Sequence, residues 1–460
     1  MNLFIVNLDF PPTAGPGVWR ALAIAKYAAS SGHNVTVFCS DRSNWHKRTD
    51  PSLLTQLPNS VRVIRVSSIF LEDIISHLHS RSGNTRVLPV KKFLNWAARV
   101  VPRLWPDSAA HWALKTTRSA RRHAKGSCPD AVITTGPPHI AHLVGYLLSK
   151  RFRTVWVMDY RDPWTDVEAA EQVLDGIYQR PLARWLENRF LSKASAVTVV
   201  SPDWLRLLAE REVTQRAKFH MVRNGHDLER NRVHELEAMR SRRDEGSYNP
   251  TSSVRVHFNG TIQTNNNVIK ELFSALELLP KKGVDPCRVC FSFCGLPKDL
   301  LTSIKETLYG ACVIDYGPLS HEESMRHCVE ADALLVLVKG GERSRVGTIP
   351  AKVYEAIALG RHVLGVLPSV NDTRDLLIEY GNASLADSTD PHDIANTLVA
   401  MITEFDRLGQ RLPLSNELSQ VQMAEKFHRS NQVQGLLEMI KGLTLGVQKL
   451  KNNHKNMYIN

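Results

Sequence analysis

Two parallel α/β domains in tandem, with the carboxyl ends of their strands facing a common cleft, are the fold that the sequence predicts. Short apolar runs alternate with helical patterns twice, over residues 1–227 and again over residues 254–410. Residues 228–253 are polar, show no sustained apolar period and are interpreted as an interdomain connection. The length of 460 residues also exceeds what one hydrophobic core supports, because domains average roughly 150 residues.

The first domain opens with a strand–turn–helix–strand unit. Residues 3–8 form an apolar run typical of a parallel strand that is buried on both faces, and a turn rich in proline and glycine follows. A helix is predicted over 18–30 and a second strand over 35–39. The unit lacks the G-x-G-x-x-G pattern, so a dinucleotide cofactor is not expected. Further strands are predicted at 131–135, 154–158, 196–200 and 218–222.

The second domain repeats the alternation. Its predicted strands are 254–258, 289–293, 312–316, 333–338 and 362–366, and its predicted helices are 267–279, 298–308, 322–331 and 351–359. Residues 411–460 are expected to form C-terminal helices and a basic tail that pack back on the first domain.

Composition is that of a soluble globular protein, with 43% apolar residues, 23% charged residues and a mean hydropathy of −0.23. The first residues read as a buried strand and not as a signal peptide, and no apolar stretch approaches the roughly 20 residues of a membrane-spanning helix. We therefore expect a cytoplasmic protein. Its association with the inner face of the membrane is a further hypothesis, which the distribution of charge suggests.

The formal charge of +12 is concentrated in one segment. Residues 81–125 hold eleven Lys or Arg residues and one acid, interleaved with Phe93, Trp96, Trp105 and Trp112. Basic and aromatic side chains together are attracted to an anionic membrane surface. Alternatively, these side chains pack as stems over the core. Nucleic acid is not an expected partner, because no nucleic-acid-binding module is visible and the charge is local.

The seven cysteines are too few and too scattered for a disulfide framework. Only Cys287, Cys290 and Cys294 cluster. If residues 287–294 alternate as a strand, Cys287 and Cys290 lie on opposite faces, which favours buried reduced thiols over a zinc site. The chain also lacks an Asp-x-Asp pattern, so no metal site is predicted.

Residues 345–360 carry the most informative chemistry. Pro350 in the first turn and Gly360 at the end delimit one helix, and the Gly347–Thr348 turn leaves backbone N–H groups free at its start. Such a helix start favours a diphosphate. Lys352 and Glu355 share one helix face, where Lys352 would meet phosphate and Glu355 would accept hydrogen bonds from ribose hydroxyls. The alternative is an exposed Lys–Glu ion pair.

This helix start resembles the donor-binding motif of the retaining GT-B glycosyltransferases of family 4, in the subgroup with Pro, Lys and Glu at this spacing. The segments 10–20, 134–138, 159–164, 224–227 and 258–261 resemble further loops of the family in the same order. The resemblance implies GT-B architecture, two Rossmann-like domains facing a cleft, and a nucleotide-sugar as co-substrate without another cofactor. The donor-binding residues that it implies are Gly15, Gly17, Arg20, Asn259, Gly260, Thr261, Arg345, Thr348, Ile349, Pro350, Lys352 and Glu355.

Two departures from the family pattern limit what carries over. Gly347 occupies the position of an earlier glutamate that would contact the donor sugar. Thr261 follows Gly260 where many members have arginine, and no basic residue comes before Lys270. Because the leaving diphosphate needs a cation, Lys339, Arg343, Arg345 or Lys352 would take that role.

Candidate catalytic residues lie in the loops of the first domain. Asp159 and Asp162 follow a predicted strand, where either could orient or deprotonate an acceptor hydroxyl, with Arg161 as a partner. The alternative for this motif is a local ion pair that holds the loop. His139 follows the Gly136–Pro137–Pro138 turn and is either catalytic or structural.

The leading hypothesis is therefore a hexosyltransferase-like enzyme that moves a sugar from a nucleotide-sugar to a saccharide or lipid-linked acceptor in bacterial surface polysaccharide biosynthesis. A sugar-nucleotide epimerase of similar fold and a basic, non-catalytic binding protein are the alternatives.

Overall fold

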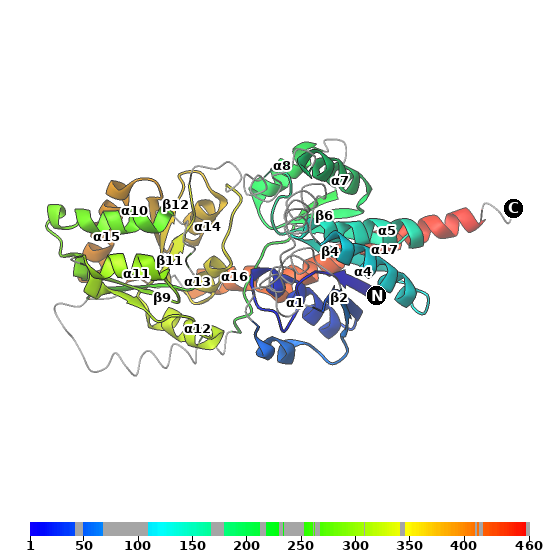
Figure 1. Ribbon diagram of the computed structural model, residues 1–460, viewed down its shortest axis with the longest axis horizontal. Helices are drawn as coiled ribbons and strands as arrows, with labels where there is room; N and C mark the ends of the chain where they lie inside the picture. The colour runs from blue at the N-terminus through cyan, green and yellow to red at the C-terminus, as the bar shows by residue number, and fades with distance from the viewer. Residues whose placement is uncertain are drawn as a thin grey trace, which may run out of the picture. The chain divides into compact units, whose positions relative to one another are not determined.

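The computed structural model describes residues 1–41, 49–67, 109–166, 179–211, 218–229, 233, 253–260, 262, 267–307, 309–340, 346–409, 412–413 and 417–456. The chain divides into two compact units, which are labelled in Figure 1 by their helices and strands. The first unit comprises residues 1–223 and 430–460, and the second comprises residues 224–429.

The first unit is built on a seven-stranded parallel sheet in the order β3-β2-β1-β4-β5-β6-β7. The central strands are buried on both faces, since Leu3 and Ile5 point into one core and Phe4 and Val6 into another. The strands are β1 (Asn2–Val6), β2 (Asn34–Ser40), β3 (Arg62–Val66), β4 (Ala131–Gly136), β5 (Val155–Tyr160), β6 (Ala196–Val199) and β7 (Phe219–Met221).

Helices cover both faces of this sheet. One face packs against α1 (Pro16–Ser30) and the C-terminal helix α17 (Arg429–Asn456). The other face packs against α4, α5, α7 and α8. The bounds of these four helices are Ala110–Ala124, His142–Phe152, Gln179–Lys193 and Pro202–Arg211.

The C-terminal helix α17 completes the core of the first unit. Its Val433, Leu436, Leu437 and Ile440 are buried together with residues of β1 and α1. The amphipathic spacing of three and four explains why this one stripe of the helix is apolar. The segment 411–460 is therefore divided, because α16 (Glu417–Phe427) belongs to the second unit.

The second unit is built on a six-stranded parallel sheet in the order β10-β9-β8-β11-β12-β13. Its strands are β8 (Val254–Phe258), β9 (Val289–Phe293), β10 (Val313–Asp315), β11 (Ala333–Leu337), β12 (His362–Leu367) and β13 (Ala383–Asp387). Its remaining helices are α10 (Asn267–Leu278), α11 (Lys298–Lys305), α12 (His321–Glu330), α13 (Ala351–Ala358), α14 (Asp372–Tyr380) and α15 (Pro391–Arg407).

The two faces of the second sheet again bury separate cores. The side chains of α10 and α15 pack with Val254 and Val256 on one face, and those of α12, α13, α14 and α16 pack with Leu334 and Val336 on the other. The prediction of two parallel α/β domains is confirmed. The edge strands β3 and β13 were not predicted.

The boundary between the units lies at residue 224 and not at 227. The turn at 224–227 belongs to the second unit because the His226 N–H donates to the Phe427 carbonyl and the Arg429 N–H donates to the His226 carbonyl, at 3.2 and 2.9 Å. Of the expected connection 228–253, the structure describes residues 228, 229, 233 and 253.

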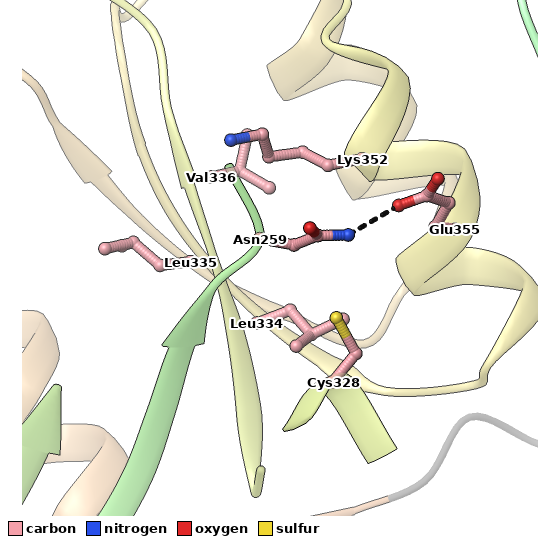
Figure 2. A pocket seen from close by; sticks show the side chains of 7 residues that line it. All are labelled: Asn259, Cys328, Leu334, Leu335, Val336, Lys352 and Glu355. Atoms are coloured by element: carbon pink, nitrogen blue, oxygen red, sulfur yellow. Dashed lines mark hydrogen bonds between the residues drawn. The ribbon is translucent and has the colours of Figure 1, made fainter. Parts of the chain in front are cut away.

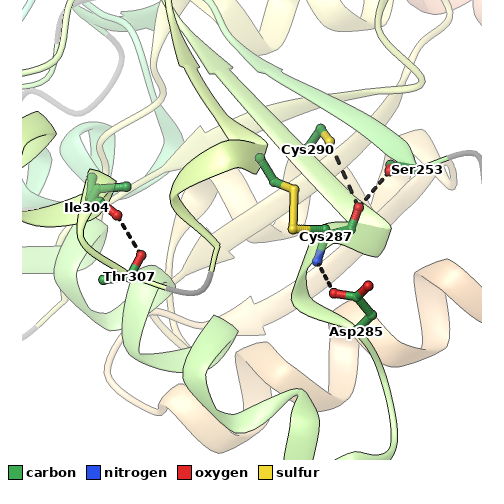
Figure 3. Close-up of a disulfide and its surroundings, with 7 residues drawn as sticks. Ser253, Asp285, Cys287, Cys290, Ile304 and Thr307 are labelled. Atoms are coloured by element: carbon green, nitrogen blue, oxygen red, sulfur yellow. Dashed lines mark hydrogen bonds between the residues drawn. A yellow bond between two sulfur atoms is a disulfide. The ribbon is translucent and has the colours of Figure 1, made fainter.

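A disulfide joins Cys287 to Cys312 in the second unit (Figure 3), with their Cα atoms 5.4 Å apart. Cys287 lies in the short helix Pro286–Arg288 before β9, and Cys312 lies directly before β10. The bond therefore ties the amino ends of two neighbouring strands. This corrects the sequence interpretation twice, because Cys287 is not part of a strand and is not a reduced thiol.

No cluster of three or more His, Cys, Asp or Glu that could hold a metal ion occurs among the residues that the structure describes. None of the helices in that part of the chain has the length and apolar character needed to cross a membrane.

Candidate functional site

Both sheets have a topological switch point at the first strand of the unit. β1 lies between β2 and β4, and β8 lies between β9 and β11. Helix crossovers leave in opposite directions from such a strand, so the space outside its carboxyl end is open, and ligands of open parallel sheets bind there. Gly15, Gly17 and Arg20 follow β1, and Asn259 and Gly260 follow β8.

In the second unit, Asn259 directly after β8 holds Glu355 of α13. The Asn259 side-chain amide donates to the Glu355 carboxylate at 2.8 Å, and its carbonyl oxygen accepts from the Ser324 hydroxyl at 2.6 Å. These two bonds fix the orientation of the amide, which in turn fixes one carboxylate oxygen of Glu355. Two residues that are 96 positions apart in sequence thus act as one polar group.

Lys352 is directed away from Glu355 in the same pocket (Figure 2). Its Nζ lies 3.3 Å from the centroid of the Phe258 ring, a cation–π contact. Among the described residues, no carboxylate forms an ion pair with Lys352. The sequence-based alternative of an exposed Lys352–Glu355 ion pair is therefore wrong.

Gly260 permits this position of Lys352. Its φ of 146° lies in the region that favours glycine, and a Cβ at this residue would lie 3.1 Å from the Lys352 Nζ. Burial lowers the pKa of Lys352 to about 7, with the Glu355 carboxylate opposing that shift. The amine is thus poised between its charged and neutral forms near neutral pH.

The pocket around these groups is small and mostly apolar. Its lining residues are Asn259, Cys328, Leu334, Leu335, Val336, Lys352 and Glu355, as Figure 2 shows. Its volume is about 10 Å³, room for no more than one water molecule. It therefore does not enclose a ligand.

A series of side-chain contacts continues from Ser324, the hydrogen-bond partner of Asn259. The Ser324 hydroxyl lies 3.5 Å from the Cys294 sulfur, which lies 3.6 Å from Nε2 of His257. His257 Nδ1 lies 2.8 Å from the Ser292 hydroxyl, and burial lowers the pKa of His257 to about 4, so its ring is neutral. Sequence reasoning singled out Cys294 as a buried thiol but missed its polar partners, because none of them belongs to a recognisable motif.

The start of α13 differs slightly from the prediction. Pro350 is the N-cap residue and the helix begins at Ala351, while Gly360 has a φ of 63° just past its end. Ile349 is buried in the core, and the Thr348 carbonyl accepts a 2.6 Å bond from the Thr373 hydroxyl of α14. The loop before α13 is thereby fixed against α14.

Two predicted donor-binding residues, Thr261 and Arg345, lie outside the described residues, as does Arg343. Gly347, at the position of the absent glutamate, is buried.

In the first unit, Asp159 and Arg20 form a buried ion pair. Arg20 Nε and Nη2 donate to the two Asp159 oxygens at 2.8 and 2.6 Å, and the Thr198 hydroxyl adds a 2.5 Å bond. Burial alone would raise the pKa of Asp159, but Arg20 and these hydrogen bonds hold it below its usual value.

This geometry corrects two expectations. Asp159 is fully buried with both oxygens engaged, so it is not positioned to receive a proton from an acceptor. Arg20 is 7% exposed and engages Asp159, so it is not available to a donor phosphate. The ion pair instead joins α1 to β5. Each of the two buried charges needs the other, because a buried charge without a partner is strongly destabilising.

Arg161 holds the loop after β4. Its Nε donates to the Gly136 carbonyl at 3.2 Å, and its guanidinium also donates to the Pro137 carbonyl. A side chain at Gly17 would collide with this guanidinium, which explains the glycine there. Gly15, at the start of α1, has a φ of 150°.

Asp162 is the one exposed carboxylate of this motif. Loss of hydration raises the pKa of Asp162, and Arg161 opposes the shift. A role for Asp162 as the base stays a prediction.

His139 lies in a buried aromatic cluster. Its ring stacks on Trp164 at 5.4 Å and packs against Tyr160, and its Nδ1 lies 3.4 Å from Nε2 of His142. Burial, then the neighbouring His142 and Arg161, lower the pKa of His139 well below its usual value. The ring is thus neutral and only 5% exposed, an environment that fits the structural alternative.

Comparison with known proteins finds a family match in the first unit. Residues 17–225 match the family described as "Glycosyl transferase 4-like domain". The match covers less than half of the chain. No significant match was found among curated protein sequences.

Solved structures show that the whole chain has the GT-B fold. A glycosyltransferase from Rickettsia africae is 14% identical with a TM-score of 0.58, over 96% of this chain and 98% of that one. WaaG, a glycosyltransferase involved in lipopolysaccharide biosynthesis, is 13% identical with a TM-score of 0.56, over 96% and 100%. A UDP-N-acetylglucosamine 2-epimerase described for Listeria monocytogenes is 10% identical with a TM-score of 0.51, over 96% and 95%.

The family match supports the resemblance to family 4 over residues 17–225, and the solved structures support the GT-B architecture. The roles of individual residues stay predictions.

Proposed function

We propose that the protein transfers a sugar from a nucleotide-sugar bound at Lys352 and Glu355 to a saccharide or lipid-linked acceptor in bacterial surface polysaccharide biosynthesis. The observation that carries the proposal is the arrangement at the β8–β11 switch point. There Asn259 holds the Glu355 carboxylate while Lys352 lies on Phe258 without a carboxylate partner among the described residues.

Each group has a task that follows from its chemistry. Glu355 accepts hydrogen bonds from the ribose hydroxyls with its remaining lone pairs. Lys352 leaves the Phe258 ring for the diphosphate, because an anion offers more to an ammonium than an aromatic face does. Gly260 and the N–H groups at the start of α13 let the diphosphate approach closely. Thr261 and Arg345 complete the donor site in this proposal.

The first unit supplies the acceptor side. Asp162 accepts the proton of the acceptor hydroxyl, and Arg161 keeps the loop after β4 in place for that step. Arg20, Asp159 and His139 position these loops from within the core.

The stereochemical outcome is proposed to be retention, which rests on the family resemblance alone. Transfer of a hexose and a lipid-linked acceptor at the membrane through residues 81–125 complete the proposal. Of that segment the structure describes residues 109–125, which include the basic helix α4.

Nucleotide binding tests the proposal directly. Isothermal titration against UDP, GDP, ADP and CMP should identify one nucleotide that binds. Glu355→Ala should weaken its binding by about 10- to 100-fold, because a hydrogen bond to a charged group contributes roughly 1.5–3 kcal/mol. Glu306→Ala, an exposed glutamate of the same unit, is the matched control and should bind as the wild type does.

An unchanged affinity of Glu355→Ala, with normal folding by circular dichroism, would contradict the assignment. The matching nucleotide-sugar with a glycan acceptor then tests transfer.

An epimerase is the second candidate, because the Listeria monocytogenes structure shares the fold. Product analysis separates the two activities. Free nucleotide together with an extended glycan indicates transfer, whereas an isomerised nucleotide-sugar without an acceptor indicates epimerisation.

A further inference from the structure

Three helices that are remote in sequence form one continuous outer layer on the first unit. α5 packs against both α4 and α7, and all three cover the same face of the sheet (Figure 1). We call the outer surface of α4, α5 and α7 the cationic helix layer. It extends well beyond the basic segment 81–125, because α5 and α7 lie later in the chain.

The charge of this layer has one sign. The three helices hold ten Lys or Arg residues and a single acid, Glu187. Glu187 is fully buried and accepts hydrogen bonds from Tyr160, Thr165 and Arg211, so it offers no charge to the outer surface. Arg118, Arg121 and Arg184 are exposed and pair with no acid among the described residues.

Large apolar side chains are exposed within the same layer. Trp185 of α7 is 63% exposed and lies next in sequence to Arg184, one helical turn before Arg189. Leu114 of α4 is 42% exposed, one turn before Arg118. Both apolar groups are thus flanked by cations on the outside of the protein, where burial in the fold does not explain them.

We propose that the cationic helix layer binds an anionic lipid bilayer, with Trp185 inserted at the level of the lipid headgroups. Basic side chains near an anionic leaflet are each attracted to it, and tryptophan prefers the boundary between headgroups and acyl chains. The two kinds of side chain occur together here on a surface made of helices that lie flat on the sheet. This surface is separate from the donor pocket, and the proposal stands whether or not the protein transfers sugars.

A bilayer fits this layer better than a nucleic acid does. Leu114 offers nothing to phosphates or bases, whereas an acyl boundary accepts both Leu114 and Trp185. A nucleic acid would contact the arginines and could stack a base on Trp185, but it would tolerate loss of Leu114.

Vesicle binding by the full chain tests the proposal. Co-sedimentation should show binding to vesicles of 70% phosphatidylcholine and 30% phosphatidylglycerol and little binding to phosphatidylcholine alone. Arg184→Glu/Arg189→Glu should reduce the affinity by about 25-fold or more, since each basic residue near an anionic surface contributes roughly fivefold. Trp185→Ala should reduce it by about tenfold, because partial burial of a large apolar side chain is lost.

Lys298→Glu/Lys305→Glu is the matched control, because it makes the same change of net charge on exposed residues of α11 in the second unit. It should bind the anionic vesicles as the wild type does. Nucleotide titration of every variant shows whether the fold and the donor pocket are intact, so failure here and failure of the proposed function are distinguishable.

Two results would overturn the proposal. One is equal loss of vesicle binding in the α7 and α11 variants, which would mean that only net charge matters. The other is displacement of the protein from anionic vesicles by single-stranded RNA that the wild type binds more tightly than it binds the vesicles.

Discussion

The two units differ in how their charged side chains are paired near the carboxyl ends of their strands. In the first unit Asp159 is fully buried, and Arg20 and Thr198 engage both of its oxygens. In the second unit Lys352 lies on an aromatic ring, and Glu355 receives a bond from a neutral amide. The charges of the first unit are paired inside the protein, whereas those of the second unit are not paired with each other. The same type of sheet thus carries a fully paired buried charge in one unit and separately held charges in the other.

The largest expected effect comes from breaking the buried Arg20–Asp159 ion pair of the first unit. Asp159→Ala should destabilise the first unit by about 3–5 kcal/mol, because it leaves the buried Arg20 charge without a partner. Urea unfolding followed by circular dichroism measures this loss. Glu404→Ala removes a carboxylate from a similar but exposed pair with Arg407, so it should change little.

The pH dependence of the same pair has a defined sign. The folded pKa of Asp159 lies below its unfolded value of about 3.9. Its contribution to stability is therefore fully present above about pH 4 and is lost as the pH falls through the folded pKa. The replacement Arg20→Met/Asp159→Leu should remove this dependence and be far less destabilising than Asp159→Ala. Equal destabilisation by both variants would show that packing, and not charge, is what the pair provides.

The next largest effect concerns the disulfide of the second unit. The disulfide Cys287–Cys312 closes a loop with a sequence separation of 25, for which chain entropy predicts about 3 kcal/mol of stabilisation. Cys312→Ser should lower the stability of the second unit by that order, and dithiothreitol should do the same to the wild type. Thermal unfolding with and without the reductant measures both. Insensitivity to dithiothreitol in the wild type, together with an unaltered Cys312→Ser variant, would exclude a stabilising disulfide.

The smallest expected effect concerns the charge of Lys352 in the second unit. With a pKa of about 7, Lys352 is half protonated at neutral pH, and a bound diphosphate would raise its pKa. Nucleotide affinity should therefore fall as the pH rises above 7, by up to about tenfold per pH unit, or about 1.4 kcal/mol. Isothermal titration in buffers of different ionisation enthalpy should detect proton uptake at pH 8. Lys352→Met should show neither the uptake nor the pH dependence, and a persistent uptake would assign it to another group.

Sequence periodicity was sufficient for the elements that are buried on both faces. β1 and β11 are nearly continuous apolar runs, so their pattern is unambiguous. In β3 and β13, polar residues such as Arg62, Arg65 and Asp387 interrupt the apolar pattern, so these two strands are recognised from their pairing.

The candidate site was predicted only in part for a similar reason. Lys352 and Glu355 share one helix turn, so their proximity follows from the sequence alone. The partner of Asp159 is 139 residues away. A clue to it existed, because Arg20 stands in an otherwise apolar helix pattern, and a buried arginine needs a carboxylate. The contact of Lys352 with Phe258 depends on backbone geometry at Gly260, which no sequence pattern reveals.

The division of α17 from the rest of the C-terminal segment has a consequence for biosynthesis. Val433, Leu436 and Ile440 complete a core whose other members are among the first residues to leave the ribosome. Domains generally fold as units in the order of their synthesis, but here the first unit to be translated is the last that can finish folding. Until α17 emerges, the apolar side chains that it covers in this core remain exposed.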